Sequence, residues 1–249
     1  MSRFIENPNL PKSEVTFLLC GQMNTAITDY FRIRGIKTAF PQVNNDIDSA
    51  VGNHIDLSAI HLGNKKVLLD KKQNALALTL ENQEAEVYYS LESVSGEYPN
   101  DIVLNIAFMG EYVIGNFKYT DKNLRNYLVN KKLINVNQGY AKCSCLIVNE
   151  KALITDDLSI YKATTKEGID SLLISKGDIK LPGHSYGFIG GASGKLSQDE
   201  VIFFGDIRIH RDYEIIKAFL NNHGCRIISF DGVDLTDYGG IIPLKEKHN

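Results

Sequence analysis

Short apolar stretches recur along the chain and predict a repeated unit. The first valine-like positions of five such stretches (Val15, Val67, Val113, Ala152 and Val201) lie 52, 46, 39 and 49 residues apart. Each stretch ends in a turn rich in Gly, Asp or Asn, and a helical pattern follows the turn. The five stretches, which we expect to be strands, are Val15–Leu19, Val67–Leu69, Tyr112–Ile114, Ala152–Ile154 and Val201–Phe204.

The expected helices combine apolar residues at helical spacing with signals for their ends. Gly35 and Gly224 stand where the first and last helical patterns stop, and Thr164–Glu167 fits an N-terminal capping box. The second pattern is the least clear of the five. The helical segments are Thr25–Arg34, Gln73–Gln83, Thr120–Leu128, the segment opening at Thr164, and Asp212–Leu220.

Two more strands follow each helix. The second strands are expected at Ile36–Phe40, Val87–Tyr89, Leu133–Val136, Leu172–Ile174 and Arg226–Phe230. After a loop, the third strands are expected at Ile55–His61, Ile102–Phe108, Tyr140–Val148, Tyr186–Gly190 and Gly239–Leu244. The unit is therefore strand–helix–strand–loop–strand, repeated five times.

One such unit cannot bury its apolar strands alone, whereas five units packed around an axis can. We therefore predict an α/β fold of five modules about a pseudo-five-fold axis, as a single domain over residues 1–249. The third strands are expected innermost and the helices outermost. A doubly wound parallel sheet is the rival architecture, but it does not explain the extra strand per unit, and no G-x-G-x-x-G turn is present.

Composition excludes several classes of function. The chain has 43% hydrophobic and 23% charged residues and a net charge of −3, with no basic stripe for nucleic acid. No apolar run approaches the roughly 18 residues that a membrane span needs. The segment Met1–Pro8 lacks the apolar core of a secretory signal. We therefore expect a cytoplasmic protein that binds neither nucleic acid nor membrane.

We expect the four cysteines to be reduced thiols, because thiols stay reduced in the cytosol. Cys143 and Cys145 form a C-x-C pair without a second Cys or His pair at ligand spacing, which is a weak zinc signal. We expect no metal and no cofactor. Cys20 and Cys225 are interpreted as packing residues.

Fragments of a known catalytic pattern stand in the third and fourth units. Asn137-Gln138-Gly139-Tyr140 resembles a Glu-Gly-Gly stretch with Gln138 in the acidic position. Gly183-His184-Ser185-Tyr186 is similar to Gly-His-x-Asp with Tyr186 in place of the aspartate. With the five-fold rhythm, these fragments resemble the pentein superfamily. It includes arginine and agmatine deiminases, dimethylarginine hydrolases, amidinotransferases and the non-catalytic ribosome anti-association factor.

Two further segments bear on the resemblance. Tyr238–Leu244 looks like the segment that ends in His-Cys in the enzymes, but Ile242 and Pro243 stand in those two places. His54-Ile55-Asp56 keeps an acidic residue where the family often places a guanidinium-binding aspartate. The resemblance implies a five-bladed α/β propeller with the usual cysteine nucleophile missing.

The missing groups matter for the chemistry that the resemblance implies. Carboxylates recognise a planar guanidinium ion through paired, charge-assisted hydrogen bonds. A cysteine thiolate then attacks the central carbon, and a histidine moves protons to the leaving amine and from the attacking water. Pro243 is no nucleophile and Gln138 carries no charge, so of the family-like groups only His184 and Asp56 remain.

Each remaining candidate has a structural alternative. His184 either points into the central channel or is a hydrogen-bonded loop residue. His54 and Asp56, two residues apart, either form a His–carboxylate pair on one strand face or belong to a solvated loop. Cys143 and Cys145 share a face that is typical of a buried strand, but Cys143 could instead face the channel and be reactive.

Two functions follow from these residues. The first is an axial pocket for a guanidino or amino-acid-like ligand, whose C–N bond would be hydrolysed if the protein is active. The second is a non-catalytic scaffold for a macromolecule. We expect no deimination through Pro243, and Cys143 is the only plausible substitute nucleophile. Asp56, Gln138, His184 and Tyr186 would line the pocket, with His54 beside Asp56 and with Asp101 or Asn105 from the second unit; the oligomeric state stays open.

Overall fold

The computed structural model describes residues 1–248 and shows an α/β protein with five small sheets. Four sheets have three strands each and are built from consecutive segments. Their strands are β4 Ala59–Gly63, β5 Lys66–Leu69 and β6 Glu86–Tyr89; β7 Ala107–Met109, β8 Tyr112–Gly115 and β9 Lys132–Asn135; β10 Cys145–Asn149, β11 Ala152–Thr155 and β12 Asp170–Leu173; β13 Ser193–Ser197, β14 Glu200–Phe203 and β15 Arg226–Ile228.

The fifth sheet joins the two ends of the chain. Its order is β1 (Ser2–Phe4), β16 (Ile241–Lys247), β2 (Val15–Cys20) and β3 (Lys37–Ala39), and Ser2 pairs with Lys247. The sequence patterns did not predict β1. Its pairing places β16 between two strands from the other end of the chain, so both ends are held in one sheet.

Every sheet repeats one connection. Its first two strands pair antiparallel, a helix follows, and the last strand returns parallel to the middle one. The middle strands have a partner on each side. Those of the four three-stranded sheets are buried throughout, except at Lys66 of β5, which explains their apolar runs. The helices are α1 Thr25–Ile33, α3 Asn74–Glu81, α4 Lys122–Arg125, α5 Leu158–Lys166 and α6 Tyr213–Asn222, with a short α2 at Ile55–Ser58 and a 3₁₀ turn η1 at Ile207–Ile209.

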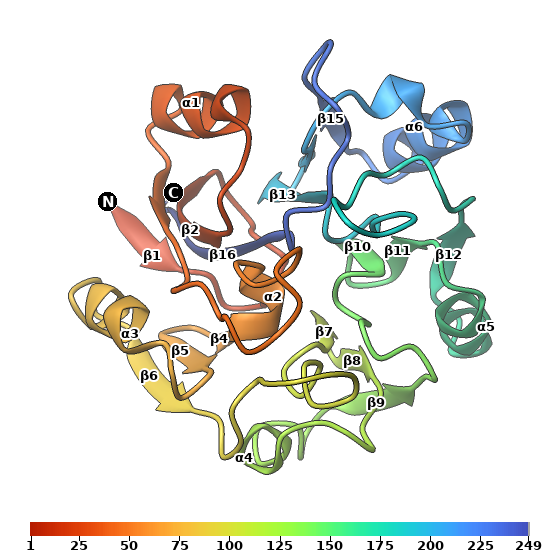
Figure 1. Cartoon of the computed structure of the whole chain (residues 1–249). Coiled ribbons are helices and arrows are strands. Elements are labelled where there is room, and N and C mark those ends of the chain that lie inside the picture. Colours follow the sequence, from red (N-terminus) through yellow and green to blue (C-terminus); the bar gives the residue numbers. More distant parts are fainter. Residues whose placement is uncertain (249) are drawn as a thin grey trace.

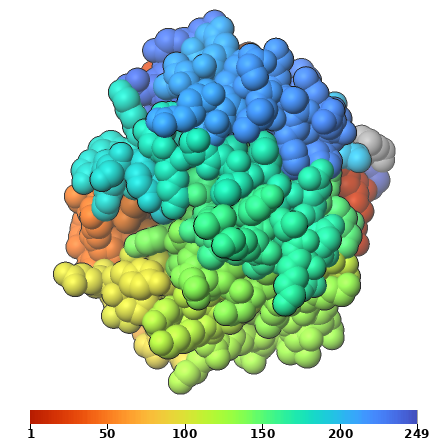
Figure 2. Space-filling view, turned by 90° about the vertical axis from the view of Figure 1, so that its right-hand side faces the viewer, coloured from red at the N-terminus to blue at the C-terminus, as the bar shows by residue number. Residues whose placement is uncertain are grey.

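The sheets lie around the middle of the molecule, with the five longer connections and their helices outside (Figure 1). The first strands of the sheets lie closest to the middle, where β13 contacts β10 and β16, and β16 contacts β4. Seen from one side, successive units form a continuous surface in sequence order (Figure 2). No helix in residues 1–248 is long and apolar enough to cross a membrane.

The apolar core is divided among the junctions between neighbouring sheets. Ile154 of β11 and Phe203 of β14 share one buried cluster, and Leu68 of β5 and Val113 of β8 share another. A cluster with Leu18 of β2 joins the last consecutive sheet to the sheet of the two termini. Each sheet therefore depends on its neighbours for burial, at roughly 1.5–3 kcal/mol per large side chain buried.

The predicted strand–helix–strand alternation is confirmed, but several details were wrong. The strands predicted to begin at Ile55, Ile102 and Tyr140 begin only at Ala59, Ala107 and Cys145, and Ile55–Ser58 forms the helix α2. Thr164 and Lys166 lie at the end of α5, whose N-cap is Asp157 with its side chain accepting from the Ser159 and Ile160 amides. The predicted helix Thr120–Leu128 is reduced to the single turn of α4. The predicted strand Tyr186–Gly190 is irregular, because hydrogen bonds to Asp237 and Ile179 hold it instead of a ladder.

Candidate functional site

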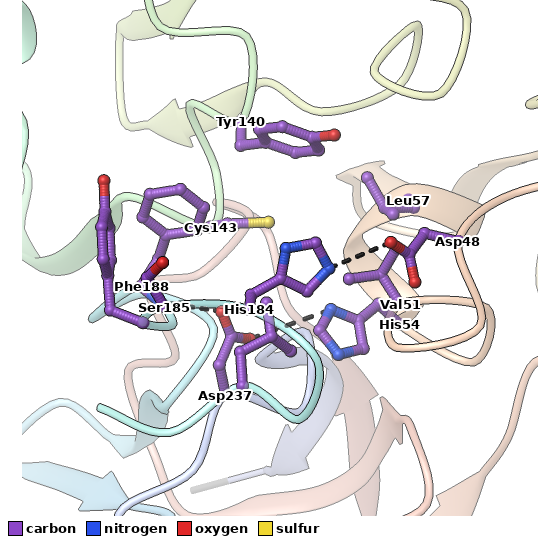
Figure 3. Close-up of a pocket in the computed structure, with 12 residues that line it drawn as sticks. Asp48, Val51, His54, Leu57, Tyr140, Cys143, His184, Ser185, Phe188 and Asp237 are labelled. Atoms are coloured by element: carbon purple, nitrogen blue, oxygen red, sulfur yellow. Dashed lines mark hydrogen bonds and ion pairs between the residues drawn. The ribbon is translucent and has the colours of Figure 1, made fainter. Parts of the chain in front are cut away.

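A cavity of about 300 Å³ opens near the middle of the molecule (Figure 3). Its residues come from loops that precede the first strands of the sheets and from the segments around residues 48–57 and 181–188. The floor carries His54, Cys143 and Asp237, and the rim carries Asp48, His184 and Ser185. The walls are apolar or aromatic, with Val51, Leu57, Leu181, Tyr140, Tyr186 and Phe188.

The thiol of Cys143 is held at the floor by two side chains from other units. It donates to Asp56 Oδ2 at 2.7 Å and accepts from the side-chain amide nitrogen of Asn105, Nδ2, at 3.2 Å. The same amide nitrogen lies 3.1 Å from the Asp56 carbonyl oxygen, while Asn105 Oδ1 accepts from the Lys142 amide at 2.8 Å. Asn105 therefore fixes both the backbone beside Cys143 and the backbone of Asp56.

Burial controls the protonation of this pair. It raises the pKa of Asp56 to about 6, with Asp237 adding to the rise and His54 opposing it. Burial, together with the Asp56 and Asp237 carboxylates, raises the pKa of Cys143 well above its ordinary value. The thiol is therefore protonated at neutral pH in the free protein, and it needs a nearby positive charge to become a thiolate.

Asp237 anchors the other side of the floor. Its Oδ2 accepts from the Phe188 amide and its Oδ1 from the Gly239 amide, each at 2.9 Å. His54 Nδ1 lies 3.8 Å from Asp237 Oδ1, with both side chains buried. A Cβ on Gly191 would lie 1.9 Å from Asp237 Oδ1, so only glycine fits there. The glycine stretches of this region thus make room for a carboxylate.

An ion pair and a group of aromatic rings form the upper part of the cavity. His184 Nε2 lies 3.0 Å from Asp48 Oδ2, and both side chains are exposed to solvent. The Tyr140 and Phe188 rings are stacked, with centroids 6.0 Å apart, and the Tyr140 hydroxyl donates to Asp101. Rings of this kind can cover the face of a planar cation.

Four polar residues, at the floor or directly behind it, occupy similar places in different units. Asp56 precedes β4, Asn105 precedes β7, Cys143 precedes β10 and Asp237 precedes β16. In the remaining unit the same position is occupied by glycines, and Gly191 contacts Asp237. The floor and the residues directly behind it therefore come from all five units.

Most of the predicted site residues do meet here. His54, Cys143, His184 and Tyr186 line the cavity, while Asp56 and Asn105 hold Cys143 from behind. Asp101 takes part only through the Tyr140 hydroxyl. The alternative in which Cys143 faces the central space is the one that the structure shows, and Cys145 lies in the apolar core.

Several placements differ from the predictions. Gln138 lies in a separate groove, where its amide donates to Asp157 Oδ2 at 3.0 Å. His54 and Asp56 share no strand face, because Asp56 lies in the first turn of α2 and His54 is its N-cap. His184 lies in a loop well before β13, because the inner strand of that unit starts at Ser193.

Sequence reasoning missed Asp237, Asp48, Tyr140 and Phe188 as lining residues. Asp237 could have been found, since it stands two residues before the Gly239-Gly240 pair that the motif comparison already singled out. Tyr140 stands in the Asn137–Tyr140 fragment and Phe188 in the predicted strand Tyr186–Gly190, but nothing in the sequence indicates that their side chains and Asp48 line one cavity. Within residues 1–248, no group of three or more His, Cys, Asp or Glu side chains could hold a metal ion.

Comparison with solved structures shows which fold this is. The chain is similar to an amidinotransferase of the saxitoxin pathway from Microseira wollei, with 8% identity, a TM-score of 0.60 and 98% of each chain covered. It is similar to the inosamine-phosphate amidinotransferase of Streptomyces griseus, with 6% identity, a TM-score of 0.62, and 99% of this chain and 98% of that one covered. The agmatine deiminase of C. jejuni has 13% identity and a TM-score of 0.54, with 91% of each chain covered.

At these identities the likeness shows the fold alone. It is the fold that these amidinotransferases and this deiminase share, as the resemblance to the pentein superfamily led us to expect. No curated protein matches the sequence. The family model of DUF6873, described as a family of unknown function, matches residues 18–242. Because this match spans most of the chain, the protein belongs to the DUF6873 family.

Proposed function

We propose that the five sheets form a five-bladed α/β propeller and that the cavity on its axis binds a small guanidino ligand. The ring of buried clusters between neighbouring sheets supports the propeller, since the last cluster joins the final unit to the first. The position of the cavity supports the ligand site, because the loops before the first strands converge there. The four free cysteines fit the cytoplasmic location that we also propose.

The single observation that carries the ligand proposal is the floor of the cavity. A buried thiol there donates to the Asp56 carboxylate behind it at 2.7 Å, and a second buried carboxylate, Asp237, belongs to the same floor. A guanidinium ion offers flat, paired N–H donors and a positive charge, which are complementary to carboxylates. The stacked Tyr140 and Phe188 rings add a surface for its face.

The same geometry suggests a reaction at Cys143. A bound guanidinium would lower the pKa of the thiol, whose proton can pass to Asp56 Oδ2. The sulfur then attacks the central carbon and the C–N bond to one amino group breaks. That nitrogen takes up the proton held by Asp56 and leaves as ammonia. Water next attacks the carbon, the C–S bond breaks, and a ureido product and the free thiol remain. The net reaction consumes one water and releases one ammonia.

The test combines binding with turnover. We expect agmatine at saturating concentration to raise the melting temperature of the wild-type protein by a few degrees, through preferential binding to the folded state. The His184→Ala variant should show a smaller shift. Absence of any shift with agmatine, arginine or methylguanidine would overturn the ligand proposal and favour a scaffold for a macromolecule.

For turnover, ammonia release from agmatine and arginine is compared between the wild type and two variants. Cys143→Ala should lower any release by about a thousandfold or more, because no other thiol lies at the floor. Cys145→Ala is the matched control, since Cys145 is equally buried but packs in the core. Release that survives Cys143→Ala would exclude Cys143 as the attacking group.

A further inference from the structure

We infer that the cavity selects guanidino cations that carry no carboxylate group. This inference rests on the proposed guanidino site and narrows its ligand class. It is based on the charges and the surfaces that a ligand would meet beyond its guanidinium group.

The lining of the cavity contains carboxylates but no permanent cation. Of the twelve lining residues, Asp48 and Asp237 are acidic, and none is Lys or Arg. Both lining imidazoles face a carboxylate already, with His184 3.0 Å from Asp48 and His54 3.8 Å from Asp237. Even with both rings protonated, the lining would therefore carry no excess positive charge.

Two lysines close to lining residues, Lys142 and Lys176, do not themselves line the cavity. The Lys176 ammonium is over the ring of Tyr186, 5.4 Å from its centroid, and interacts with the Asp156 carboxyl. Lys142 lines two small cavities of about 20 and 10 Å³ and interacts electrostatically with Asp56. Each lysine thus already interacts with a carboxyl group, and neither lysine belongs to the lining of the main cavity.

The walls above the floor suit the rest of such a ligand. Val51, Leu57 and Leu181 offer apolar surface, and Phe188 adds an aromatic face. An alkyl chain can be buried against these side chains, whereas a carboxylate would lose its water without gaining a cationic partner. It would also be repelled by Asp48 at the rim and by Asp237 at the floor.

Calorimetric titration with three matched probes tests this inference. Agmatine differs from arginine by lacking the carboxylate, and arginine methyl ester keeps the arginine skeleton with the carboxylate masked. We expect agmatine and the methyl ester to bind the wild-type protein about tenfold or more tighter than arginine. The carboxylate of bound arginine would lie a few ångströms from the carboxylates of the cavity, and repulsion at that distance is strong enough for such a difference.

A variant that adds a positive charge to the lining tests the same inference in the opposite direction, because it should favour a ligand with a carboxylate. Ser185 lines the rim and is exposed, so Ser185→Arg can be accommodated, and it should reduce the preference for agmatine over arginine at least severalfold. Ser185→Gln is the uncharged control. Arginine binding as tightly as agmatine would overturn this inference and leave the guanidino site standing. Failure of all three probes to bind would overturn both.

Discussion

Two adjacent carboxyl groups, those of Asp156 and Asp157, have pKa values shifted in opposite directions. Burial raises the pKa of Asp156 to about 7, with Asp157 and Asp237 adding to it and Lys176 and the Ile189 amide opposing it. Burial also acts on Asp157, but hydrogen bonds from Ser159, Ile160 and Gln138 outweigh it and lower the pKa. The two residues should therefore contribute to stability with opposite dependence on pH.

The sign for Asp156 follows from proton linkage. Between about pH 4 and pH 7 the folded protein holds a proton at Asp156 that the unfolded chain has lost, so this group lowers stability as pH rises. An asparagine at position 156 does not titrate, so the variant does not lose this stability as pH rises. We expect Asp156→Asn to gain about 2 kcal/mol in unfolding free energy relative to wild type between pH 5 and pH 8, measured by urea unfolding.

Asp157→Asn is the matched comparison, and it should become less stable relative to wild type over a rise from about pH 3 to pH 5. An Asp156→Asn variant whose stability runs parallel to wild type at all pH values would show that Asp156 titrates normally. It would also remove Asp156 from the group of carboxyls that interact with the cavity floor.

At the scale of elements, the glycine turn before β13 leaves room for the Asp237 carboxylate at the floor of the cavity. A methyl group at position 191 would lie 1.9 Å from Asp237 Oδ1, so Gly191→Ala must displace Asp237 or the turn. We expect a loss of at least about 2 kcal/mol in unfolding free energy, together with loss of the thermal shift by agmatine.

Gly168, which follows the C-terminal end of α5, provides the control for this change. Its φ is +74° but nothing lies within 4 Å of an added Cβ, so Gly168→Ala should cost only about 1 kcal/mol of backbone strain. It should leave the shift by agmatine intact. Equal behaviour of the two variants would mean that the close approach at Gly191 does not position Asp237.

The elements also show what the sequence could and could not predict. The middle strands and the parallel return strands were readable, because hydrophobic periodicity reports which segments are buried. The segment 186–190 looked like a strand since it mixes aromatic and apolar residues, yet its hydrogen bonds go to Asp237 and Ile179. The edge strand β1 is too short to carry a pattern, and its pairing with β16 depends on the closure of the chain.

On the scale of the whole molecule, the site results from repetition. Asp56, Asn105, Cys143 and Asp237 are far apart in sequence, and they meet because each precedes the first strand of its own sheet. The five-fold rhythm predicted that residues from different units would meet, and six of the eight candidate residues lie in the cavity or directly behind its thiol. Which side chains face inward depends on loop conformations that no spacing encodes. The assignment of all 249 residues to a single domain stays a prediction.

The central claim is that Cys143 lies at the floor of a cavity that attracts guanidinium-like cations. Alkylation with 2-chloroacetamidine and with 2-chloroacetamide tests it most directly, because the two reagents have nearly the same shape and only the amidine is cationic. We predict that, at neutral pH, the amidine modifies Cys143 at least about tenfold faster than the amide does, relative to their rates with free cysteine. Agmatine should slow this modification, and mass spectrometry should find Cys20, Cys145 and Cys225 unmodified. Equal relative rates, or modification of the other cysteines first, would contradict the account.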